Sequence, residues 1–141
     1  MIRALLDSDV ILDYVLHREL HYEDAEKLLE ALADLEFIGH VSATALLNVH
    51  YFAAKEVDRP FAKEQVVKLL SLLSVSTIDE SCFQTALALN FDDYEDAVQC
   101  ASAMSEGLDA IVTRNTKDYK DSPIKVYSPA EFLKVIEARR K

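Results

Sequence analysis

Glycine, proline, cysteine and tryptophan are all scarce in this chain of 141 residues, which contains 2 glycines, 3 prolines, 2 cysteines and no tryptophan. So few glycines and prolines leave no room for a linker, a low-complexity tract or an internal repeat that would divide the chain. The hydrophobic content of 50% is enough for one core, but the length is too short for two ordinary domains. We therefore expect a single domain over residues 1–141.

Long apolar runs are also missing, because no stretch approaches the roughly 20 residues of a membrane-spanning helix. The N-terminus opens on a strand-like segment and not on a basic region followed by a cleavable apolar one. Cys82 and Cys100 lie among helically spaced apolar residues, which fits buried thiols in a reducing compartment better than a disulfide or a redox pair. These features predict a cytoplasmic protein without a membrane partner.

Positive charge is in deficit, since the formal net charge is −10 at pH 7. Proteins bind phosphate backbones through Lys and Arg, so this charge counts against a nucleic-acid partner. Such a partner would need a local basic patch or bound divalent cations to offset the acidic surface.

The apolar pattern alternates between strand-like and helix-like segments along the whole chain. Strands are expected at residues 2–6, 37–41, 75–78, 110–112 and 124–127. Helices are expected at residues 10–17, 22–35, 43–57, 60–73, 80–90, 93–106 and from 129 onward. Strands separated by helices predict an α/β fold, in which a parallel sheet is covered on both faces.

Several helix ends carry recognisable capping residues. Ser8 or Asp9 is expected to cap the first helix, and Ser42 and Asp79 two later ones. Gly107 stands in a C-cap position, and residues 128–131 form a capping box with proline at the first helical position.

Acidic and amide side chains gather at segment ends that should share one edge of the sheet. They are Asp7 after the first strand, Asp92, Asp93 and Asp96 at the start of a helix, and Asn115 and Asp118 after the fourth strand. Two carboxylates about 4 Å apart repel by roughly 4 kcal/mol at an effective dielectric near 20, which a divalent cation would offset. Mg²⁺ or Mn²⁺ suits oxygen ligands of this kind. Asp92 and Asp93 have the alternative role of capping a helix.

Other polar and aromatic residues give weaker signals. His17 and His21 are four apart, but they straddle a predicted helix end and are expected to be structural and not metal ligands. Tyr51, Phe52 and residues 69–73 are expected to pack and not to stack on bases. Exposed apolar helix residues could instead form a protein interface.

Six short motifs together resemble the PIN-domain ribonucleases, especially the VapC-like toxins of toxin–antitoxin pairs. The motifs lie at residues 5–13, 41–48, 93–98, 111–115, 117–119 and 128–133. Each motif is weak alone, but their order and spacing are fairly specific, and they span nearly the whole chain. The resemblance implies a five-stranded parallel sheet and an acidic pocket that uses Mg²⁺ or Mn²⁺ to hydrolyse RNA phosphodiesters.

The same resemblance assigns roles to individual residues. It implies that Asp7 and Asp96 are catalytic metal ligands and that Asn115 or Asp118 fills a fourth, more variable polar position. The supporting residues that it implies are Asp9, where the family usually has Asn, Thr113 close by, and Asp93, acting through water.

One position departs from the family pattern. Asn48 falls six residues after Ser42, where most of the family has a metal-binding Glu. An amide oxygen can still ligate a metal or position water, but one negative charge is lost, and metal affinity should fall unless another acid compensates. Glu56 and Glu95 lie off the motif and are not expected to replace it.

Arg114, Lys117 and Lys120 lie in the loop that follows the fourth strand and are candidates for gripping the RNA backbone. The equally open alternative is an ordinary solvated loop.

The resemblance also implies a cognate antitoxin as partner and a homodimer. Two other functions stay open: a catalytically weak PIN fold that only binds RNA or antitoxin, and a haloacid-dehalogenase-type phosphatase suggested by the Asp-x-Asp of Asp7 and Asp9. The phosphatase reading lacks a convincing Gly-Asp loop and room for a cap domain.

Overall fold

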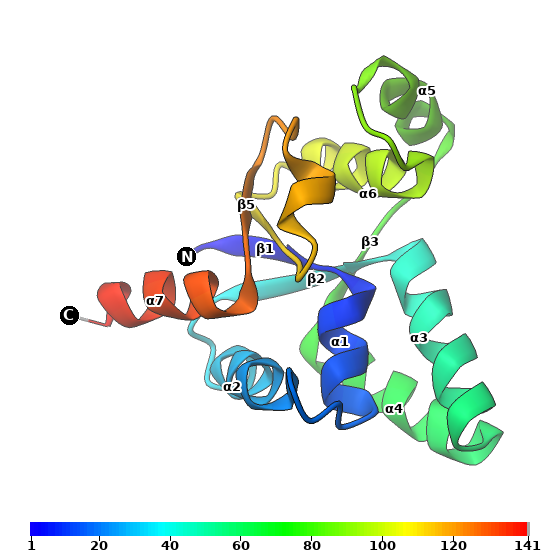
Figure 1. Ribbon diagram of the computed structural model, residues 1–141, viewed down its shortest axis with the longest axis vertical. Coiled ribbons are helices and arrows are strands. Elements are labelled where there is room, and N and C mark those ends of the chain that lie inside the picture. The colour runs from blue at the N-terminus through cyan, green and yellow to red at the C-terminus, as the bar shows by residue number, and fades with distance from the viewer. Residues whose placement is uncertain (141) are drawn as a thin grey trace.

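The computed structural model describes residues 1–140, and its elements alternate along the chain (Figure 1). The strands are β1 (Arg3–Leu6), β2 (Ile38–Ser42), β3 (Ser74–Ser76), β4 (Ala110–Val112) and β5 (Lys125–Tyr127). The α-helices are α1 (Ser8–Val15), α2 (Tyr22–Ala33), α3 (Ala43–Glu56), α4 (Arg59–Leu72), α5 (Glu80–Ala88), α6 (Tyr94–Ser105) and α7 (Pro129–Arg139). A short 3₁₀-helix, η1 (Thr116–Tyr119), lies in the segment expected to be a plain loop.

The five strands form one parallel sheet in the order β3-β2-β1-β4-β5. β1 is central, so Leu5 pairs with His40 of β2 on one side and with Ile111 of β4 on the other. The chain builds the sheet outward from β1 in one direction and then restarts with β4 in the opposite direction. The carboxyl ends of β1 and β4 therefore flank the point where the strand order reverses, which is where open α/β sheets place their ligand crevices.

Helices cover both faces of this sheet (Figure 1). Alternate residues of a strand point to opposite faces. Ala4 and Leu6 accordingly join the larger core, with α1, α2, α3, α4 and α7, whereas Leu5 packs on the other face with Cys100 of α6. The predicted α/β architecture, a five-stranded parallel sheet with helices on both faces, is confirmed.

Both glycines have a structural reason. A Cβ atom on Gly39 of β2 would lie 2.6 Å from a methyl carbon of Leu32 and 2.7 Å from one of Leu73, so only glycine lets these side chains pack so closely. Gly107 has a φ of 67°. Its N–H bonds Met104 O and that of Leu108 bonds Ala103 O, which is the Schellman arrangement at the end of α6. The predicted C-cap position is confirmed.

Most predicted caps are confirmed, and one is wrong. Ser42, Asp79 and Ser128 cap α3, α5 and α7, and Ser128 forms the expected capping box with Glu131. The first helix is capped by Asp7 and not by Ser8 or Asp9, because the chain turns into α1 immediately after β1.

Several minor expectations can also be compared with the structure. Cys82 and Cys100 are buried free thiols, as expected. His17 stacks on Tyr22 with ring centroids 3.6 Å apart, which is a structural role. The packing expectation is wrong for Tyr51, which is 58% exposed and contacts Phe52 edge to face. Within residues 1–140, no helix is long and apolar enough to cross a membrane.

Candidate active site

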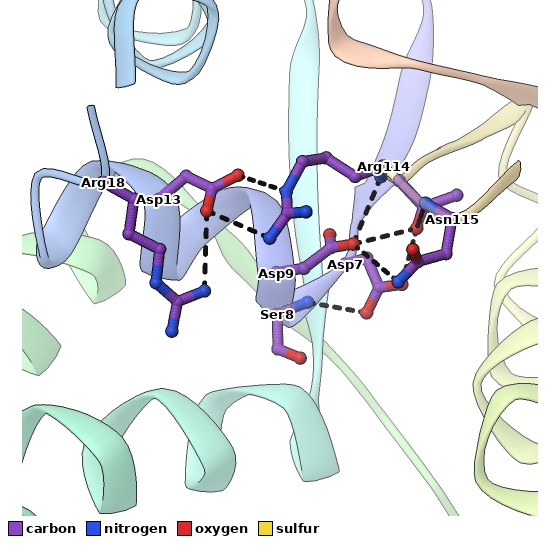
Figure 2. A network of polar contacts seen from close by, with 8 residues as sticks. Asp7, Ser8, Asp9, Asp13, Arg18, Arg114 and Asn115 are labelled. Carbon is purple, nitrogen blue, oxygen red and sulfur yellow. Dashed lines mark hydrogen bonds and ion pairs between the residues drawn. The ribbon is translucent and has the colours of Figure 1, made fainter. Parts of the chain in front are cut away.

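Asp7 lies at the carboxyl end of β1, and its carboxylate serves both the fold and the site. Its Oδ1 accepts a hydrogen bond from the backbone N–H of Ser8 at 2.7 Å, which caps α1 (Figure 2). Its Oδ2 accepts one from Thr113 Oγ1 at 2.9 Å, across the junction with β4. The strand order thus brings two residues that are 106 positions apart into direct contact.

Asp96 reaches the same place from the first turn of α6. The hydroxyl oxygen of Tyr119 lies 3.1 Å from Asp96 Oδ1 and 3.4 Å from Asp7 Oδ2. One phenolic oxygen therefore contacts both carboxylates, so the two acids that the resemblance singled out face one shared space. Since a hydroxyl has a single hydrogen, it can donate to only one of them at a time.

A buried chain of hydrogen bonds fixes the direction of that hydroxyl. Ser42 Oγ donates to Gln99 Oε1 at 2.7 Å, and Gln99 Nε2 donates to the Tyr119 oxygen at 2.7 Å. Because the Tyr119 oxygen already receives a proton from Gln99, its own hydrogen is left to point toward the carboxylates. Figure 1 shows that the elements involved, β2, α6 and the segment between β4 and β5, come together at one edge of the sheet.

Asp96 is held in an environment that disfavours its charged form. Burial raises the pKa of Asp96 to about 7, and the negative charges of Asp7, Asp93 and Asp118 act in the same direction. Asp93 caps α6 by accepting from the backbone N–H of Asp96 at 3.2 Å. The capping alternative is thus confirmed for Asp93 but not for Asp92, which precedes the cap and is exposed.

Asp9 forms a second acidic position beside Asp7. Its Oδ2 accepts from the backbone N–H of Arg114 and from Asn115 Nδ2, each at 3.2 Å (Figure 2). Its Oδ1 is buried and has no hydrogen-bond partner among the described residues. Burial, followed by the charge of Asp7, raises the pKa of Asp9 to about 6. An unpaired carboxylate oxygen in such a position is costly unless a proton or a cation accompanies it.

Arg114 is occupied by a structural contact. Its Nε donates to Asp13 Oδ2 at 2.6 Å and its Nη2 lies 3.3 Å from Oδ1 of the same carboxylate, which is only 1% exposed. Arg18 approaches Asp13 from the other side at 3.5 Å. Figure 2 shows the Arg114 side chain extending from the site back along α1 toward Asp13. Among the predicted RNA-binding cations, Arg114 therefore already holds a buried partner.

The remaining predicted residues lie at the rim of the site. Lys117, Asp118 and Lys120 are exposed in or next to η1, where they are open to a ligand. Asn115, also exposed, forms a backbone bond to Thr113 Oγ1 at 3.1 Å in addition to its side-chain bond to Asp9.

Asn48 lies on α3 and faces the start of α6. Its Nδ2 donates a hydrogen bond to Glu95 Oε1 at 3.0 Å. A carboxylate thus stands directly beside the position where the family pattern has an acid, although it comes from a different helix.

The side chains at this edge fit a hard divalent cation. Asp7, Asp9 and Asp96 offer carboxylate oxygens, Asn115 an amide oxygen and Thr113 a hydroxyl, and Mg²⁺ and Mn²⁺ prefer such ligands. Within the described residues, no three His, Cys, Asp or Glu side chains converge as a ready ligand set. That agrees with the usual Mg²⁺ arrangement, in which one or two carboxylates bind the ion and waters complete its shell.

Sequence reasoning missed the residues that organise the site. Tyr119, Gln99 and Ser42 form the hydrogen-bond chain behind Asp96, and Asp13 anchors Arg114. A signal existed for Gln99, a polar side chain among the buried residues of α6. For Tyr119 the signal was its aromatic ring at the end of a polar segment.

Comparison with known proteins agrees with this geometry. The family model described as "PIN domain" matches residues 3–117. The ribonuclease VapC1 of Aquifex aeolicus is 24% identical over 135 residues, which cover 92% of each chain. The chain therefore belongs to the PIN-domain family.

Solved structures show the same fold. A VapBC2 structure from Rickettsia felis, bound to a DNA fragment from its promoter, superimposes with a TM-score of 0.71 at 18% identity and covers 90% of this chain and 98% of its own. A toxin–antitoxin complex from Klebsiella pneumoniae gives a TM-score of 0.69 at 25% identity, covering 89% and 97%. The phosphatase alternative is wrong, because the Asp-x-Asp of this chain belongs to a PIN domain.

Proposed function

We propose that this protein is a divalent-metal-dependent endoribonuclease and the toxin of a toxin–antitoxin pair. The observation that carries the proposal is the meeting of Asp7 and Asp96 at the reversal point of the sheet, where one Tyr119 oxygen contacts both. The relative from Aquifex aeolicus is named a ribonuclease, which supports the reaction class.

Asp7 and Asp96 would hold the cation, with Asp9, Asn115 and Asp118 close enough to contribute. When bound, Mg²⁺ or Mn²⁺ lowers the pKa of water and neutralises charge on the phosphate that is attacked. The chain's own residues orient the carboxylates: Thr113 and the Ser8 N–H hold Asp7, and the Gln99–Tyr119 pair holds Asp96. Asp93 fixes the first turn of α6 and so the position of Asp96.

RNA would approach over η1. Lys117 and Lys120 are exposed there and supply positive charge beside the acidic site, while the cation compensates part of the net charge of −10. In this proposal the role of Arg114 is to position the loop after β4, because its guanidinium is paired with Asp13.

The antitoxin partner is proposed from the nature of the structural neighbours, which include toxin–antitoxin complexes. Exposed apolar side chains along α3 and α4, which include Leu47, Tyr51, Val67 and Leu70, offer an apolar surface for a protein partner. A homodimer and a cytoplasmic location belong to the same proposal.

Cleavage of a structured RNA tests the activity. We expect cleavage with Mn²⁺ or Mg²⁺ that stops in EDTA, and we expect Asp7→Asn and Asp96→Asn to lower the rate by at least the 100-fold that loss of a key charge-stabilising group typically costs. Glu80→Gln, which removes an exposed carboxylate in the first turn of α5, is the control for a general loss of charge. Cleavage that persists in EDTA or in both Asp variants would contradict the proposal.

The second candidate function is a PIN fold that binds RNA or antitoxin without cutting. Asn48 favours it, because this position lacks the acid that most of the family has there. If the wild-type protein binds RNA but cleaves it with no metal ion, and Asn48→Glu creates cleavage, the binding module is the better description.

A further inference from the structure

Asn48 of α3 and Glu95 of α6 meet across the carboxyl edge of the sheet. Their hydrogen bond, from Nδ2 to Oε1 at 3.0 Å, joins residues that are 47 positions apart. One turn further along α6, Gln99 contacts Ser42, the N-cap of α3. Because Glu95 and Gln99 are four apart, they lie on the same face of α6. That face is the one turned toward α3.

The two side chains are complementary in a way that a glutamate at position 48 would not allow. Asn48 uses its amide N–H as a donor, whereas a carboxylate at the same place would be an acceptor that repels Glu95. The chain therefore lacks a negative charge on α3 and has one beside the same position, carried by α6. Glu95 directly precedes Asp96 in the sequence, so the site and this charge share the first turn of one helix.

We infer that Glu95 supplies the third negative charge of the cation site, in place of the acid that position 48 lacks, and that Asn48 holds it there. This inference rests on the proposed function, since it requires Asp7 and Asp96 to bind a divalent cation. Glu95 is exposed at the mouth of the site, so it strengthens cation binding by its charge and completes no closed cage. The role is that of a positioning and charge-supplying residue.

An acid in the first turn of α6 has a competing explanation, which is a favourable interaction with the helix dipole. Glu80 occupies the equivalent first turn of α5 and is exposed as well. Glu80→Gln therefore removes the same charge from the same kind of helix position, far from Asn48. It is the matched control.

The test is titration of Mn²⁺ into the full-length metal-free protein by calorimetry at low ionic strength. Glu95→Gln keeps an oxygen that can accept the Asn48 hydrogen bond but removes the charge. We expect Mn²⁺ affinity to fall on the order of tenfold, because a unit charge within several ångströms of a divalent ion is worth about that factor even in a water-like dielectric. The melting temperature of the metal-free protein should not fall, and Glu80→Gln should bind Mn²⁺ as the wild type does.

The double variant Asn48→Glu/Glu95→Gln moves the charge from α6 back to α3, and we expect it to regain most of the wild-type affinity. Wild-type affinity in Glu95→Gln, or no recovery in the double variant, would overturn the role of Glu95. The proposed function is judged separately by Asp7→Asn. If the wild type binds no Mn²⁺, or Asp7→Asn binds it equally well, the cation site itself is wrong and the role of Glu95 falls with it.

Discussion

Arg114 and Asp13 form a two-point ion pair that links the loop after β4 to the middle of α1, with contacts of 2.6 and 3.3 Å. The carboxylate of Asp13 is buried, and only Arg18, at 3.5 Å, would remain near it if Arg114 were lost. This pair fixes the backbone N–H of Arg114, which in turn donates to Asp9 in the site.

Arg114→Ala should therefore lower the free energy of unfolding by about 3 kcal/mol, the typical cost of leaving one partner of a buried pair uncompensated. Arg114→Lys should lie between this variant and the wild type, since it keeps the charge and loses the planar fork. Urea denaturation followed by circular dichroism measures both. Stability within about 0.5 kcal/mol of wild type for Arg114→Ala would show that the pair does not hold the loop.

Tyr119→Phe removes the hydroxyl that lies between Asp7 and Asp96. It leaves Gln99 Nε2 without its buried acceptor and the two carboxylates without a shared donor. We expect a loss of about 1–3 kcal/mol in the metal-free protein, the usual cost of an unsatisfied buried polar group. Gln99→Leu/Tyr119→Phe should recover part of it, because the stranded amide is removed as well. A Tyr119→Phe protein as stable as the wild type would contradict this description of the site.

Lys117 and Lys120 should contribute to RNA binding without contributing to stability. In an Asp96→Asn background, which prevents cleavage, Lys117→Ala/Lys120→Ala should weaken RNA binding. It should also reduce the slope of log affinity against log salt by roughly 0.7 per lost phosphate contact to a single strand. Lys63→Ala, an exposed lysine on α4, is the control. Fluorescence anisotropy at several salt concentrations makes the measurement. An unchanged salt slope would leave η1 as an ordinary solvated segment.

The stability of the metal-free protein should fall as pH rises from about 4 to about 7. In the folded state the pKa of Asp9 is about 6 and that of Asp96 about 7, both above the ordinary 3.8. The folded protein therefore holds more protons than the unfolded chain in this window, and stability is lost as the pH rises through it.

Asp7→Asn should make this pH dependence shallower, because the charge of Asp7 contributes to both raised pKa values. Thermal melts in the presence of a chelator, compared for the two proteins between pH 5 and 8, measure the slopes. Parallel curves would show that Asp7 does not interact with the other two carboxylates.

The sequence pattern predicted the sheet and the meeting of Asp7 with Asp96 for a simple physical reason. Parallel strands bring their carboxyl ends to one edge, so acids at the ends of strands and at the start of a following helix must gather there. The prediction did not extend to Gln99, Tyr119 and Glu95, because their contacts depend on how α6 is rotated against α3 and on the turn made by η1. Periodicity places a residue on a helix face but does not say which neighbour that face will meet.

The same limit explains Asn48. The sequence showed that an acid was missing at this position, whereas only the packing of α3 against α6 shows that Glu95 stands beside it. Arg114 is a similar case, since its charge suggested RNA binding and its buried partner Asp13 lies 101 positions away.

The most direct test of the central claim is the anomalous diffraction of crystals of the full-length protein grown with Mn²⁺. The account predicts a manganese peak between Asp7 and Asp96, with oxygen atoms of both carboxylates at about 2.2 Å, the usual bond length for such ions. A manganese peak bound elsewhere, with the Tyr119 hydroxyl still between two metal-free carboxylates, would contradict it.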